Sequence, residues 1–204
     1  MKRLSIDLET YSSVDLETID KTEDNKKEIE GLELQLERLN SLADILLKLS
    51  SLDANIDKME KREVLISEIF DYVLDILRKS IDEKNVKIIC DYEDYEIKVD
   101  YYWISEALIN IIKNALSLDR LTKIKISSNK NPIYTEIIIE DDGGGIKEEN
   151  LKRIFERFYK SPDSKGFGIG LAMAKSIVEA NNGAISVKNG KDGAIFKIKF
   201  YNVT

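Results

Sequence analysis

The sequence predicts an α+β protein in which a helical front segment precedes a domain of alternating short strands and helices. Two observations support this class. Residues 26–52 carry leucine and isoleucine at three- and four-residue steps, which is the spacing of one helix face. Residues 60–201 instead alternate between short apolar runs and stretches of helical periodicity, a pattern typical of strands interleaved with helices. The 204-residue length allows one domain of ordinary size plus a smaller element.

The front segment, residues 1–54, is predicted to form a helical hairpin. Residues 1–21 carry an imperfect helical stripe, a turn is expected at Thr22–Asn25, and the stripe from Lys26 to Leu52 is strong. A hairpin cannot bury this stripe alone, so two copies are expected to pair as a four-helix bundle. The alternative is that the leucines pack on the chain's own following domain.

The remainder, residues 55–204, is predicted to be a separate domain whose elements follow from apolar periodicity, caps and turn residues. Helices are expected at Val64–Lys84, from the cap Asp100 to Leu116, and at Ile169–Asn181 before the C-cap Asn182-Gly183. Strands are expected at Val86–Asp91, Tyr95–Val99, Lys123–Ser128, Tyr134–Glu140, Ala184–Lys188 and Ala194–Tyr201.

Composition excludes several functional classes. Residues 1–60 hold 8 basic and 15 acidic side chains, whereas residues 61–204 hold 23 of each, which argues against a nucleic-acid-binding surface. No apolar run approaches the ~18–20 residues of a membrane span, and no signal peptide opens the chain, so a cytoplasmic location is expected. Cys90 is the single cysteine, which excludes an internal disulfide, and its apolar neighbours predict a buried thiol.

Two glycine-rich stretches together indicate a nucleotide site. A buried-type strand ends in Asp141 and three glycines, which offer a carboxylate and a backbone that a flat ligand can approach closely. Gly166, Gly168 and Gly170 alternate just before a helix, whose free N–H groups can hold phosphate oxygens. The dinucleotide fingerprint G-x-G-x-x-G is excluded, because the spacing is G-x-G-x-G and no βαβ unit follows.

The order of these and three further motifs resembles that of the histidine-kinase-type ATP-binding domain. Asn110-x-x-x-Asn114 resembles the asparagine box, Asp141-x-Gly143-x-Gly145-Ile146 the first glycine box, Phe155-x-x-Phe158 the phenylalanine box, Gly166-x-Gly168-x-Gly170-Leu171 the second glycine box, and Gly193–Phe196 the last glycine motif. The resemblance covers roughly residues 60–201. It implies a two-layer α/β sandwich, a mixed sheet with helices on one face, that binds ATP and Mg²⁺.

The resemblance also implies roles for individual residues. Asn114 would offer its carbonyl oxygen to Mg²⁺, and Asp141 would accept the adenine amino group. Asn110 stands where ATP-hydrolysing relatives and anti-sigma serine kinases commonly carry Glu; because asparagine cannot act as a general base, it favours the histidine-kinase branch. The purine would lie against Gly143, Gly145 and Ile146. The lid would span Lys147–Lys165, with Phe155 and Phe158 anchoring its apolar side. The residues near the phosphates would be Lys160, Lys165, Gly166, Gly168, Gly170 and Leu171.

Two departures from the family pattern bear on nucleotide binding. Asp142 stands where the family often has asparagine, which adds a negative charge. Ser117-Leu118 replaces a pair that often includes an aromatic residue near the base, so the stacking contact is missing from the prediction.

The first residues carry two competing resemblances. Ser5–Ser12 resembles a phosphoacceptor box, with Ile6 at the histidine position and Asp7 at the acidic residue that assists proton transfer. The same residues resemble the opening strand of phage-type DNA polymerase proofreading exonucleases, in which Asp7 and Glu9 would hold two metal ions. No later acidic motif supports a nuclease. The chain contains no histidine, so it cannot form phosphohistidine on itself.

We therefore interpret the chain as the ATP-binding catalytic region of a two-component sensor histidine kinase, which binds Mg-ATP for phosphoryl transfer to histidine. The expected partners are a second copy of the chain and a response regulator or a histidine-bearing protein. The chain would be cytoplasmic, or the cytosolic part of a larger membrane sensor. The alternatives are a non-enzymatic ATP-binding regulator, a pseudokinase, and a protein-serine kinase of the same superfamily, which Asn110 disfavours.

Overall fold

The computed structural model describes residues 23–55, 58–160 and 166–202. Contacts divide the chain into two compact units, Met1–Asp44 and Ile45–Thr204. Among the described helices, none combines the length and the apolar composition that crossing a membrane requires.

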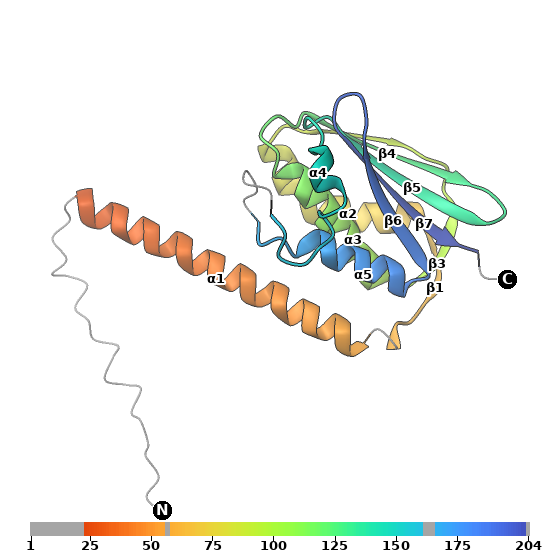
Figure 1. Cartoon of the computed structure of the whole chain (residues 1–204), viewed down its shortest axis with the longest axis horizontal. Helices are drawn as coiled ribbons and strands as arrows, with labels where there is room; N and C mark the ends of the chain where they lie inside the picture. The colour runs from red at the N-terminus through yellow and green to blue at the C-terminus, as the bar shows by residue number, and fades with distance from the viewer. Residues whose placement is uncertain (1–22, 56–57, 161–165, 203–204) are drawn as a thin grey trace, which may run out of the picture. The chain divides into compact units, whose positions relative to one another are not determined.

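One long helix, α1 (Glu23–Asn55), carries the leucine stripe (Figure 1). The helix predicted from Lys26 to Leu52 is confirmed. The turn predicted at Thr22–Asn25 is wrong from Glu23 onward, because the helix has already begun there; an acidic residue suits the first turn of a helix, where the dipole is positive. The first helix of the predicted hairpin, residues 1–21, lies outside the described residues. Large side chains of the stripe are exposed, among them Leu32, Leu36, Leu39 and Leu46.

The last turns of α1 belong to the second unit and pack into its core. Leu49 and Leu52 are buried, and Leu52 is part of the main hydrophobic cluster. Lys48 Nζ donates a hydrogen bond to Glu106 Oε2 at 2.7 Å, which forms an ion pair. Because Glu106 is largely buried, this lysine supplies the partner that a desolvated carboxylate needs.

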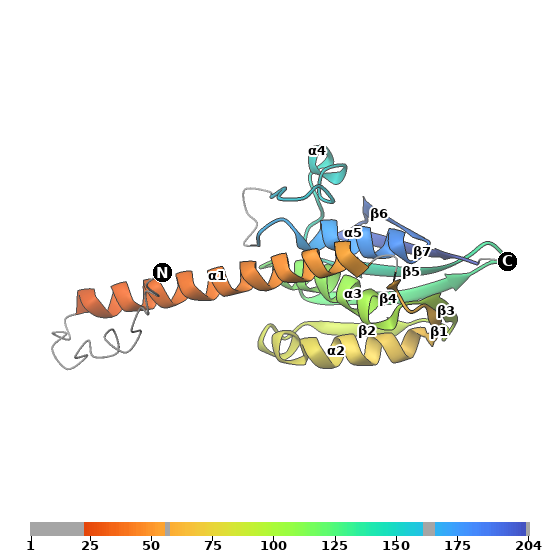
Figure 2. The same ribbon diagram turned by 90° about the horizontal axis from the view of Figure 1, so that it is seen from below.

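The second unit has two layers, a five-stranded sheet and a layer of helices on one of its faces (Figures 1 and 2). The strand order is β2-β4-β5-β7-β6. The strands are β2 (Lys87–Asp91), β4 (Lys123–Lys130), β5 (Tyr134–Asp141), β6 (Gly183–Asn189) and β7 (Ala194–Tyr201). β2 and β4 are parallel and the other neighbours are antiparallel, so the sheet is mixed, as predicted.

The register places apolar side chains on the helix-covered face of the sheet. Ile126 pairs with Ile139, and Ile137 pairs with Ile198; all four are buried. Because side chains alternate along a strand, the next positions face the other way; most of them are polar, with Ile138 and Ile195 as exceptions. On that open face Glu136 forms ion pairs with two lysines of β7.

The helix layer consists of α2 (Ile66–Glu83), α3 (Tyr101–Leu116) and α5 (Gly170–Ala180). The helix α3 is buried on most of its surface, as its apolar sequence predicts. Asp100 caps it as expected, because its side chain accepts a hydrogen bond from Trp103 N at 3.1 Å. A short fourth helix, α4 (Glu148–Leu151), was not predicted.

A second, two-stranded sheet corrects one helix boundary. β1 (Arg62–Leu65) pairs with β3 (Glu96–Val99) in antiparallel fashion, so α2 begins at Ile66 rather than at the predicted Val64. Val64 is buried and pairs with Ile97, which gives its β-branched side chain a strand partner.

The prediction of a buried Cys90 is wrong. The residue lies in β2, the edge strand of the large sheet, and its side chain is exposed. Partial burial, with a smaller contribution from Asp71, raises the pKa of the Cys90 thiol, so the thiol stays protonated at neutral pH.

Candidate nucleotide-binding site

The start of α5 lies against α3 at Asn110. A Cβ added to Gly170 would stand 3.1 Å from Asn110 Oδ1, so a larger residue at this position would require the Asn110 side chain to shift. Asn110 Nδ2 donates to the backbone oxygen of Glu106 at 3.0 Å, which orients the amide oxygen toward α5. The asparagine box and the second glycine box, far apart in sequence, are therefore neighbours.

Asn114 lies one turn further along α3 and is half-buried. Its side-chain amide has no hydrogen-bond partner among the described residues, while its backbone oxygen accepts from Ser117. The described part of the chain holds no group of three acidic, cysteine or histidine side chains that could bind a metal ion. A cation at Asn114 would need further oxygens from phosphates and water, which is how Mg²⁺ is often held.

Asp141 ends β5 and is 9% exposed. Its Oδ1 accepts hydrogen bonds from Gly143 N at 2.9 Å and from Ala194 N at 3.2 Å, while Oδ2 has no partner among the described residues. Burial raises the pKa of the Asp141 carboxyl, although these two backbone donors act in the opposite direction. One oxygen is thus held by the backbone and the other is left to accept from a ligand.

Gly193 makes this geometry possible. A Cβ at Gly193 would overlap Asp141 Oδ1 and would lie 2.6 Å from the Asp141 carbonyl carbon. The glycine that precedes β7 therefore leaves the space that the Asp141 carboxylate occupies.

The neighbouring Asp142 has a different environment. Its carboxylate accepts hydrogen bonds from the backbone nitrogens of Thr122 and Lys123, each at 2.9 Å. Burial acts to raise the pKa of the Asp142 carboxyl, but the hydrogen bonds from Thr122 and Lys123 outweigh it and lower the pKa. The side chain caps the start of β4, so its charge is directed to the backbone of that strand.

The first glycine box is hydrogen-bonded to the hairpin between β6 and β7. Gly144 N donates to Asp192 O at 3.0 Å, and Gly145 has a positive φ of 76°. Asn189 accepts from Ile146 N at 2.8 Å and donates back to Ile146 O at 2.7 Å. The Asn189 side-chain amide thus pairs with both backbone groups of Ile146, as the backbone of a neighbouring strand would.

Asn189 was missed by sequence reasoning. It precedes Gly190 in a hairpin turn, where asparagine is common because its side chain bonds to the nearby backbone. The sequence therefore does not indicate that Asn189 also bonds to the distant Ile146. Leu118, recognised only as a departure from the family pattern, is half-buried, and a Cβ at Gly143 would overlap its side chain. An apolar side chain thus lies at Gly143, the glycine predicted to border the base, although it is not aromatic.

The structure describes residues Lys147 to Lys160 of the segment predicted as the ATP lid, with α4 near its start. Phe155 is half-buried against the core, and its ring meets the ring of Phe196 edge-on at 6.4 Å, so its predicted anchoring role is confirmed. Phe158 is 64% exposed and has a positive φ of 64°, so its predicted anchoring role is wrong. Its backbone N–H donates to Gly168 O at 2.8 Å, which ties the lid to the second glycine box.

We expect the two phenylalanines to differ in stability. Phe155→Ala should lower the free energy of unfolding by about 2 kcal/mol, since part of a core-facing ring is lost. Phe158→Ala should change it by less than about 0.5 kcal/mol, because an exposed ring contributes little. Denaturant unfolding of both variants measures the difference, and equal losses would contradict the assignment.

The remaining predicted residues that the structure describes lie in the sequence between the end of β5 and the first turn of α5. Gly166 is exposed, and Leu171 and Ile146 are half-buried against the core. Gly168 has a positive φ of 72°, and a Cβ there would stand 2.8 Å from the Phe158 carbonyl carbon. The side chain of Lys160 is exposed. Lys165, Ile6 and Asp7 lie outside the described residues.

The mixed five-stranded sheet with helices on one face defines a two-layer α/β sandwich. A family model described as histidine kinase-, DNA gyrase B-, and HSP90-like ATPase matches residues 99–202. The chain belongs to this family.

Proteins similar in sequence include sensor proteins and sensor histidine kinases. The sensor protein KdpD of Clostridium acetobutylicum is 33% identical over 178 residues, which cover 83% of this chain and 20% of KdpD. The chain therefore spans about a fifth of the length of that relative.

Solved structures of similar fold include histidine kinases. AdeS of Acinetobacter baumannii has a TM-score of 0.69 at 27% identity and covers 85% of this chain and 83% of AdeS. The histidine kinase ThkA in complex with the response regulator protein TrrA has a TM-score of 0.70 at 24% identity, covering 91% of this chain and 53% of that one, and shows the shared fold.

Proposed function

We propose that this chain is the ATP-binding catalytic region of a two-component sensor histidine kinase and supplies the γ-phosphoryl group of Mg-ATP to a histidine. The Asp141 carboxylate carries the proposal: its backbone-held Oδ1 and available Oδ2 fit an acceptor for the adenine amino group. Gly143, Gly145 and Ile146 would border the base, and the start of α5 at Gly170 would hold the phosphates.

We assign the Mg²⁺ ligand to Asn114. Its half-buried amide has no partner among the described side chains, and a neutral oxygen suits a cation that shares its charge with phosphate and water. Bound Mg²⁺ would neutralise the charge that develops on the phosphoryl oxygens. The protein's own contribution would be to orient the nucleotide, with Lys160 and Lys165 of the lid near the phosphates.

The acceptor histidine must lie outside these 204 residues, because they contain none. The proposed partners are therefore a histidine-bearing protein and, downstream of it, a response regulator; the similarity in fold to ThkA, solved with TrrA, supports the second. We place the chain in the cytoplasm, as the cytosolic part of a longer sensor.

The test has two stages. Calorimetry should detect Mg-ATP binding to the intact chain, and absence of binding to the folded protein would end the proposal. Radiolabelled ATP should then place acid-labile phosphate on a histidine-bearing helical hairpin supplied in trans. Binding without transfer to any such hairpin would favour the alternative of a non-enzymatic ATP-binding regulator.

We also propose that α1 makes a dimer through the leucine stripe. Leu36, Leu39 and Leu46 are exposed on one stripe, and a second copy would bury them as in a helix bundle. Leu39→Asp combined with Leu46→Asp should give a monomer that still binds ATP. Leu34→Asp, off the stripe, is the control and should leave the dimer intact in analytical ultracentrifugation. A parent chain that is monomeric at high micromolar concentration would contradict the proposal.

A further inference from the structure

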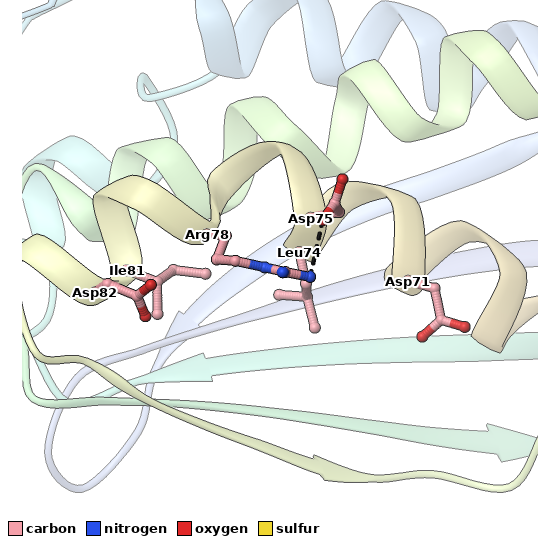
Figure 3. Close-up of a pocket in the computed structure, with 6 residues that line it drawn as sticks. All are labelled: Asp71, Leu74, Asp75, Arg78, Ile81 and Asp82. Atoms are coloured by element: carbon pink, nitrogen blue, oxygen red, sulfur yellow. Dashed lines mark ion pairs between the residues drawn. The ribbon is translucent and has the colours of Figure 1, made fainter.

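A groove of about 520 Å³ runs along one side of α2, and none of its lining residues belongs to the nucleotide site (Figure 3). The lining residues recur at three- and four-residue steps and so form one stripe of the helix: Asp71, Leu74, Asp75, Arg78, Ile81 and Asp82. Leu74 and Ile81 are half-buried against the core, which gives the groove an apolar floor.

The edge strand β2 runs beside this stripe. At one end Val86 N donates to Ile81 O at 3.1 Å, and at the other the rings of Phe70 and Tyr92 lie 5.8 Å apart. The stripe from Asp71 to Asp82 is about 16 Å long at the helical rise. The five residues of β2 span about the same length, so the strand edge runs alongside the stripe, although the residues that line the groove all belong to α2.

The outer edge of β2 has free backbone groups for a further strand. Among the described strands, only β4 pairs with β2. Lys87 N donates to Thr122 O at 2.8 Å, and in a parallel ladder each residue directs both of its backbone groups to the same side. Ile88 and Cys90 therefore direct their N–H and C=O groups to the open edge, where an added strand can pair with them.

The acidic side chains of the groove favour a ligand with basic side chains. Arg78 pairs with Asp75 at 2.8 Å, which leaves Asp71 and Asp82 near the two ends of the stripe (Figure 3). No described group of acidic side chains here is arranged to hold a metal ion. Two carboxylates separated by an apolar floor complement a chain that carries cations at its ends and an apolar side chain between them.

We propose that the groove binds an extended segment of a partner protein with the pattern basic-x-apolar-x-basic, added as an outer strand on β2. Alternate side chains of a strand point the same way, so all three would face α2. The basic side chains would reach Asp71 and Asp82, and the apolar one would pack on Leu74 and Ile81. The backbone of the segment would bond to Ile88 and Cys90. This binding is independent of the proposed nucleotide site.

The probe is the peptide acetyl-Lys-Thr-Val-Thr-Lys-amide, titrated into the intact ¹⁵N-labelled chain at millimolar concentration. The amides of Ile88 and Cys90 should become protected from hydrogen exchange, whereas those of Lys87 and Ile89 should keep the protection that β4 already provides. The thiol of Cys90, the single cysteine of the chain, should react more slowly with a thiol reagent.

Matched variants test the charges. Asp71→Asn combined with Asp82→Asn should weaken peptide binding about 3- to 10-fold, the range expected for two exposed ion pairs. Glu83→Gln removes a charge from the same helix outside the groove and should leave the affinity unchanged. Mg-ATP binding should be the same in all variants, which confirms that they are folded.

Three results would overturn the proposal. The first is equal binding of a peptide with proline in place of valine, since proline cannot donate to an edge strand. The second is binding without protection of Ile88 and Cys90, which indicates attraction of any cation. The third is protection that rises with protein concentration without peptide, which would assign the edge to a second copy of this chain.

Discussion

Replacing Asp141 by asparagine is expected to weaken ATP binding by about 10- to 100-fold, or roughly 1–3 kcal/mol, while the fold persists. The amide oxygen can still accept from Gly143 N and Ala194 N, as Oδ1 does in the parent. The amide nitrogen then replaces Oδ2 and presents a donor where the adenine amino group also presents a donor. Calorimetric titration with Mg-ATP measures the loss.

The adjacent Asp142 is the matched control. Asp142→Asn retains the size of the side chain and loses a charge that caps β4 through Thr122 and Lys123. We expect a loss of about 1–2 kcal/mol in the free energy of unfolding, because hydrogen bonds to a charged acceptor are the stronger kind, and little change in ATP affinity. If both variants lose ATP affinity equally, Asp141 has no special role in recognising the base.

Replacing Gly193 by alanine is expected to damage both stability and ATP binding. The added Cβ would collide with the backbone and Oδ1 of Asp141 within a buried part of the sheet. Overpacking of a rigid neighbour costs about 1–3 kcal/mol or more, and here it displaces the carboxylate itself. We expect a lower free energy of unfolding and no detectable Mg-ATP binding.

Gly31→Ala serves as the control for Gly193→Ala. Among the described residues no atom lies within 4 Å of a Cβ at Gly31, and this glycine belongs to α1, which holds none of the predicted site residues. Calorimetry with Mg-ATP should therefore match the parent. A Gly193→Ala protein that binds Mg-ATP like the parent would show that Asp141 tolerates displacement or does not contact the base.

Local patterns in the sequence were sufficient to predict the elements that are determined by interactions between residues close together in the chain. The helix from Tyr101 to Leu116 was predicted with its cap Asp100, because the apolar spacing and the capping oxygen act within a few residues. The same holds for the strands that lead into Asp141 and away from Gly193. The order of the glycine and asparagine boxes identified the family, because each box places a particular backbone or side-chain group at one point of the fold.

Long-range contacts decided what the sequence alone could not. Val64 continues a helical apolar pattern, yet it lies in a strand because Ile97 pairs with it. Phe155 and Phe158 belong to the same motif, and nothing in the sequence distinguishes them. Only the position of Phe196 in the folded chain shows which ring is packed and which is exposed. Cys90 lies in an apolar run, but its strand is at the edge of the sheet, where no further strand covers it among those described.

The nucleotide site shows the same division. The sequence by itself determined that Asp141, Asn114 and the second glycine box belong to one ATP-binding family, since their types and order carry that information. The tertiary structure decided that Asn189 holds the loop at Ile146 and that Asp142 caps β4. These contacts join residues that are about 20 to 40 positions apart, and their geometry exists only once the sheet has assembled.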